Sequence, residues 1–100
     1  MAAMKEVMFD KTEIIVVDRS GKSPEMLNLP YDKIVSIQFD KTTARKRLST
    51  IPTEKITITI RGRESPAALF QYRQPEYWEE YKTGLVKFAK DNRITVHNNL

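Results

Sequence analysis

The clearest alternation of apolar and polar positions in the chain lies between residues 55 and 61. Ile56, Ile58 and Ile60 alternate there with threonine and arginine. Successive side chains of a strand point to opposite faces, so this period of two predicts a strand that is buried on one face. The segment 33–39 has the same pattern, with Val35, Ile37 and Phe39 on one side, and predicts another strand.

Shorter apolar segments between turn residues predict five more strands. We expect these at 7–9, 13–18, 26–29, 44–49 and 67–73. Segment 13–18 is β-branched and apolar on both faces, which favours a strand inside the fold. Residues 41–43 separate two of the predicted strands, and Pro52-Thr53-Glu54 is expected to break the chain before the next one.

The period then changes to that of a helix, which we expect at about residues 75–91. Pro75 suits a first helical turn, where its missing N–H costs nothing. Gly84 borders the apolar face of this helix, which indicates close packing against the sheet. In the tail, 92–100, residues 94–96 form either a short strand or no regular structure. One 100° arc of the helix carries Trp78, Tyr81, Leu85, Phe88 and Ala89.

These elements predict one mainly β domain over residues 1–100. Seven antiparallel strands, between about residues 5 and 73, would form a rolled sheet or barrel. The helix cannot bury its aromatic face alone, and is therefore expected to cap the open end of that barrel.

The order of seven strands and a C-terminal helix resembles the pleckstrin-homology-like superfold. The segment 29–37, Leu-Pro-Tyr-Asp-Lys-Ile-Val-Ser-Ile, is similar to the strand entry of small bacterial pleckstrin-homology-like and GRAM domains. The resemblance implies a scaffold for protein or lipid contact. Phosphoinositide-binding members often carry a Lys-x-Arg motif in the first hairpin, where this chain has Asp10-Lys11-Thr12-Glu13, so no site residue is carried over.

Composition removes several classes of chemistry. The chain has no cysteine, which excludes disulfides and thiolate metal sites, and its longest apolar run, 14–17, is too short to span a membrane. We expect a cytoplasmic protein. His97, the single histidine, lies near the end of the chain, and the acids Glu76, Glu79 and Glu80 suit a solvated helix start. We therefore expect no catalytic, cofactor or metal site, and no enzyme activity.

Charge gives the one candidate contact surface. The formal net charge is +4, and residues 41–63 carry seven bases against one acid, Glu54. Lys41, Arg45, Lys46 and Arg47 are the candidate residues for contact with anions or lipid. The alternative is that these charges only protect an exposed strand from edge-to-edge pairing. Nucleic acid is disfavoured, because most aromatic residues are assigned to the core.

The leading functional hypothesis is a non-catalytic interaction or scaffold domain that binds protein partners or itself through strand edges or the helix flank. The second hypothesis is weak attachment to an anionic membrane surface through segment 41–63.

Overall fold

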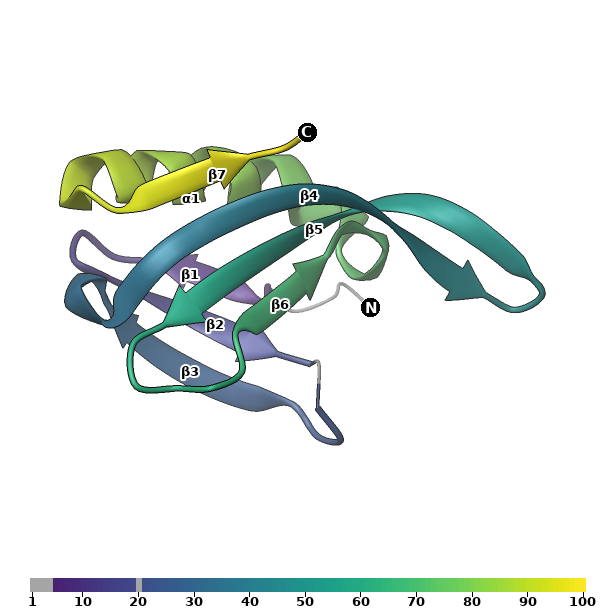
Figure 1. The fold of residues 1–100 in the computed structure, drawn as a ribbon, viewed down its shortest axis with the longest axis horizontal. Helices are drawn as coiled ribbons and strands as arrows, with labels where there is room; N and C mark the ends of the chain where they lie inside the picture. Colours follow the sequence, from purple (N-terminus) through teal and green to yellow (C-terminus); the bar gives the residue numbers. More distant parts are fainter. Residues whose placement is uncertain (1–4, 20) are drawn as a thin grey trace.

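The computed structural model describes residues 5–19 and 21–100, and these form seven strands and one long helix (Figure 1). The mainly β fold with a C-terminal helix is therefore confirmed. The strands are β1 (Val7–Phe9), β2 (Glu13–Asp18), β3 (Glu25–Pro30), β4 (Ile34–Lys46), β5 (Ser49–Ile60), β6 (Ala67–Phe70) and β7 (Thr95–Asn98), and the helix is α1 (Trp78–Asn92).

The strands form two sheets rather than one closed barrel. One sheet has the order β1-β2-β3 and the other has the order β6-β5-β4-β7. β7 follows the helix and runs parallel to β4, whereas all the other pairs are antiparallel. The prediction of seven antiparallel strands before the helix was therefore wrong, because six precede α1 in the described chain and the seventh lies in the predicted tail.

One of the seven predicted strands is lost because the segments 33–39 and 44–49, predicted as two strands, belong mainly to the single strand β4. β4 runs through residues 41–43, which were expected to interrupt it, and β5 runs through Pro52. Pro52 pairs with Thr43, beyond the point where β6 leaves β5. A proline is tolerated in a strand where no neighbouring strand would need its missing N–H. No strand lies beside β5 on that side at Pro52, so Pro52 does not break β5.

The helix boundaries differ slightly from the prediction. Residues Pro75–Tyr77 form a single 3₁₀ turn, and the α-helix begins at Trp78. β6 ends at Phe70, and a second 3₁₀ turn, Gln71–Arg73, replaces the rest of the predicted strand. Proline at the start of the first turn lacks the N–H that an α-helix would leave unpaired there.

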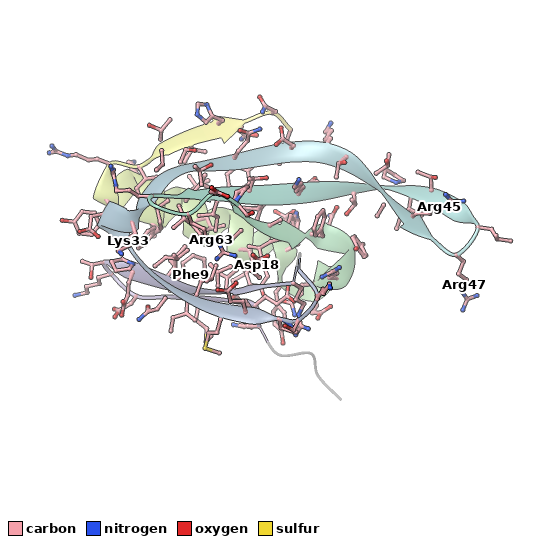
Figure 2. All side chains as sticks on the ribbon, turned by 60° about the horizontal axis from the view of Figure 1, so that its bottom comes forward. Phe9, Asp18, Lys33, Arg45, Arg47 and Arg63 are labelled. Atoms are coloured by element: carbon pink, nitrogen blue, oxygen red, sulfur yellow. The ribbon has the colours of Figure 1, made fainter. Side chains whose placement is uncertain are left out.

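The hydrophobic core lies between the two sheets and α1 (Figures 1 and 2). Ile56, Ile58 and Ile60 of β5 are buried, as their alternation predicted. The five residues predicted on the apolar arc of the helix are all buried too. The largest fully buried side chain is that of Trp78, at 1% exposure.

Gly84 of α1 lies directly against Phe9 of β1. A Cβ atom at this position would stand 2.5 Å from Cζ of Phe9, which is closer than side-chain atoms approach. The predicted close packing is therefore confirmed, and its partner is the ring of Phe9.

We expect Gly84→Ala to stabilise the protein only when Phe9 is absent. In a Phe9→Ala background, alanine should gain about 1 kcal/mol through its helix propensity. With Phe9 present, displacement of the ring should cancel this gain, so urea denaturation of the four variants should show a coupling energy near 1 kcal/mol. Equal effects of Gly84→Ala in both backgrounds would contradict the contact.

Candidate functional site

The four candidate basic residues lie on one structure, the part of the β4–β5 hairpin over residues 41–52, called the arm below. β7 pairs with residues 36–39 of β4, and β6 pairs with residues 55–58 of β5. Beyond these positions each strand pairs only with the other, and the hairpin projects from the domain (Figure 1). The structure therefore brings the candidate residues together along the arm.

The four residues differ in their surroundings. Lys41 stands at the base of the arm, opposite Glu54 in the register. Arg45 and Lys46 are at the end of β4, and Arg47 is in the turn. Figure 2 shows Arg45 and Arg47 near the far end of the arm, and both are exposed. Within the described chain, neither forms an ion pair.

The tip of the arm has two residues that a hairpin turn would not require. Arg47 has φ of 57°, a left-handed conformation that favours glycine or asparagine and costs other residues about 1 kcal/mol. Leu48, the next residue, is 97% exposed. Glycine at position 47 would adopt this conformation with less strain, so stability of the turn does not explain this pair.

The remaining bases of segment 41–63 belong to the body of the domain. Nη2 of Arg63 lies 3.2 Å from Oδ2 of Asp18 and 3.1 Å from Oε1 of Glu25, which ties the end of β5 to the other sheet. Arg61 donates to the carbonyl of Asp32, and Lys55 lies over the ring of Phe70. The excess of charge in this segment therefore does not form one continuous surface.

Glu54, the one acid of the segment, holds the base of the arm to α1. Its carboxylate accepts a hydrogen bond from the indole N–H of Trp78 at 2.9 Å and forms an ion pair with Lys82 at 3.0 Å. Burial alone would raise the pKa of Glu54, but these two hydrogen bonds, together with the positive charges of Lys82 and Lys41, lower the pKa. The hydrogen bond to Glu54 in turn raises the pKa of Lys82.

A second buried polar cluster joins the start of β1 to the helix. The backbone N–H of Glu6 donates to the hydroxyl of Tyr81 at 2.7 Å and to Oε1 of Gln74 at 3.0 Å. The Tyr81 hydroxyl also contacts Gln74, and the Glu6 carboxylate pairs with Arg19. Burial raises the pKa of Tyr81. These groups bond to one another, so the cluster is structural. No sequence pattern indicated this cluster.

The residues considered for catalysis are dispersed. His97 is exposed on β7, opposite Gln38, and Glu79 and Glu80 form surface ion pairs with Lys82 and Lys5. Among the described residues, no three His, Asp or Glu side chains are placed to hold a metal ion. Nor does any helix of the described chain have the length and apolar character needed to cross a membrane.

A hollow of about 620 Å³ lies between the β1–β2 turn and the end of α1. Two of its charged groups pair with each other, since Nζ of Lys87 lies 3.1 Å from Oδ2 of Asp91. Asn92 closes its wall by donating to the carbonyl of Lys11.

The outer face of the β1–β3 sheet is more apolar than the exposed face of an antiparallel sheet usually is. The register places Met8 beside Ile15, and Val17 beside Met26, all on the side opposite the core. Met8 and Met26 are 41% and 68% exposed, and Ile15 and Val17 are partly buried. These four residues are called the apolar face below. Figure 2 shows side chains of this sheet pointing away from the rest of the domain.

The second sheet of the same protein provides an internal comparison. Val35 is exposed at the register shift between Ile34 and Ser36, and not on the buried side with Ile37 and Phe39 as predicted. The outward positions next to it carry polar side chains, namely Ser36, Gln38, Thr57 and Thr59. This is the alternation expected when one face of an antiparallel sheet meets water. The apolar face is therefore a specific property of the β1–β3 sheet. The apolar segment 13–18 was predicted to lie inside the fold, but only one side of β2 faces the core.

Comparison of the chain with protein-family models, with curated proteins and with solved structures gave no match. The pleckstrin-homology-like resemblance stays a prediction. Functional inference consequently depends on the surfaces of this chain alone.

Proposed function

We propose that the chain is a non-catalytic interaction domain that self-associates through the apolar face of the β1–β3 sheet. The observation that carries the proposal is the row of Met8, Ile15, Val17 and Met26 across three neighbouring strands. Contiguous apolar surface of this kind marks contact sites, since exposing it to water is unfavourable.

A second copy of the chain suits this surface for two reasons. The four residues of the apolar face are uncharged, and Glu13, at the start of β2, is the one charged residue that the register of the three strands places on the same side, so like-charge repulsion between two identical faces is small. Sheets pack face to face through interdigitating side chains, with their strands about 30° apart. A twofold axis brings the same patch of both copies together, and the flexible thioethers of Met8 and Met26 can adjust to each other.

The test is a concentration series measured by sedimentation and light scattering. We expect the wild type to form dimers. Met8→Lys/Met26→Lys should stay a folded monomer, because dimerisation would bury the lysines of both copies in one interface. Val35→Lys is the matched control, since Val35 is exposed by 46% on the other sheet. It should dimerise as the wild type does.

Two results would overturn the proposal. One is a wild type that stays monomeric at every concentration at which it is soluble. The other is equal loss of association in the Val35→Lys control, which would show that the apolar face is not the contact.

A further inference from the structure

The arm carries the whole net charge of the protein. Within residues 41–52 there are four bases and no acid, which equals the formal net charge of +4. The other 88 residues therefore have 13 bases and 13 acids. A neutral body with a cationic projection is suited to contact with an anionic surface.

The arm also has an apolar end. Leu48 is almost completely exposed, and Lys46 and Arg47 precede it directly in the sequence. The strained φ of Arg47 shows that this turn keeps a charged residue where glycine would fit with less strain. An apolar side chain beside cations matches the boundary between lipid headgroups and acyl chains.

We propose that the arm docks on the surface of an anionic phospholipid bilayer, with Leu48 entering the interface and Arg45 and Arg47 at the headgroup phosphates. This contact is separate from the apolar face of the β1–β3 sheet and does not depend on self-association.

The shape of the arm favours a bilayer over a protein or a nucleic acid. A specific protein interface buries about 800 Å² on each partner, whereas this end of the arm is two strands wide. A bilayer needs no complementary shape. Residues 41–52 also contain no aromatic side chain on which nucleic-acid bases could stack.

The first test is co-sedimentation with vesicles of phosphatidylcholine, with and without phosphatidylserine, at low and physiological salt. The wild type should bind only the anionic vesicles, and more weakly as salt increases. Each arginine at the surface contributes about fivefold to the partition coefficient. Arg45→Gln/Arg47→Gln should therefore lower it about 25-fold. Lys33→Gln/Lys90→Gln, with the same charge change at exposed positions on the body, should change it less than about threefold, because salt screens distant charges.

The second test follows the tip itself. The chain has no cysteine, so Leu48→Cys gives a single site for a fluorophore that reports polarity. Its emission should shift to the blue with anionic vesicles and stay unchanged with neutral ones. The same label at Glu79→Cys, an exposed position on α1, should not respond.

Four results would overturn the proposal. They are no binding of the folded wild type to anionic vesicles, equal binding to neutral vesicles, equal losses in the arm and body variants, and a label at Leu48→Cys that does not respond. Arm-dependent binding to a DNA duplex that is tighter than binding to vesicles at physiological salt would assign the arm to nucleic acid instead.

Discussion

Replacing Trp78 with alanine is expected to lower the free energy of unfolding by about 3–5 kcal/mol. The Trp78 side chain is 1% exposed and belongs to the core between the sheets and α1. Its loss leaves a large cavity and removes the donor to Glu54. For a domain of this size, the melting temperature should fall by at least about 12 °C, which thermal melting followed by circular dichroism would measure.

Two further variants separate the contributions of Trp78. Trp78→Phe keeps an aromatic ring but lacks the indole N–H, so it should cost less, about 1–3 kcal/mol. Val86→Ala is the control on the same helix, since Val86 is exposed, and it should stay within about 0.5 kcal/mol of the wild type. A loss below about 1 kcal/mol for Trp78→Ala would show that the core does not depend on this ring.

The sequence predicts the core well because burial follows the local period of each element. The isoleucines of β5 alternate, and the aromatic residues of α1 repeat at helical spacing. Both patterns are complete within one segment of the chain. No tertiary information is needed to identify the buried face.

Features that depend on a distant partner were not predicted. Pro52 would interrupt β5 only if β6 extended alongside it. The residues near Pro52 do not show where β6 ends. The parallel pairing of β7 with β4 likewise requires the helix to return the chain to the start of β4. The seven-stranded antiparallel barrel was wrong at these two places.

The candidate surface was predicted in part for the same reason. Sequence proximity was enough to group Lys41, Arg45, Lys46 and Arg47, because one hairpin carries all four. It did not separate Lys41, which faces Glu54, from the arginines near the tip. Leu48 was placed within a strand, so its exposure in the turn could not be anticipated.

The role of Glu54 was missed, although a signal for it exists. Trp78 was correctly assigned to the core, and a buried indole N–H needs an acceptor. Glu54 is the single acid between residues 41 and 63. The donor of Trp78 and the acceptor Glu54 therefore indicate a hydrogen bond between these two residues, although they lie far apart in the sequence.

Substituting Glu54 with glutamine is expected to make stability less dependent on acid pH. At about pH 7, Glu54→Gln should cost about 1–2 kcal/mol, because Lys82 loses its closer charged partner while the amide oxygen can still accept from Trp78. The folded protein lowers the pKa of Glu54 from its ordinary value of 4.5. The stabilisation by this carboxylate is therefore fully present above about pH 4.5 and is lost as the pH falls through the lowered pKa.

The difference between wild type and Glu54→Gln should consequently decrease below about pH 4.5, which urea denaturation between about pH 7 and pH 3 would show. Glu79→Gln is the matched control, since Glu79 also contacts Lys82, at 3.3 Å, but its side chain is 82% exposed. It should change stability by less than about 0.5 kcal/mol. A constant difference across this range, or an equal loss in the control, would mean that the pairing of Glu54 with α1 does not stabilise the base of the arm.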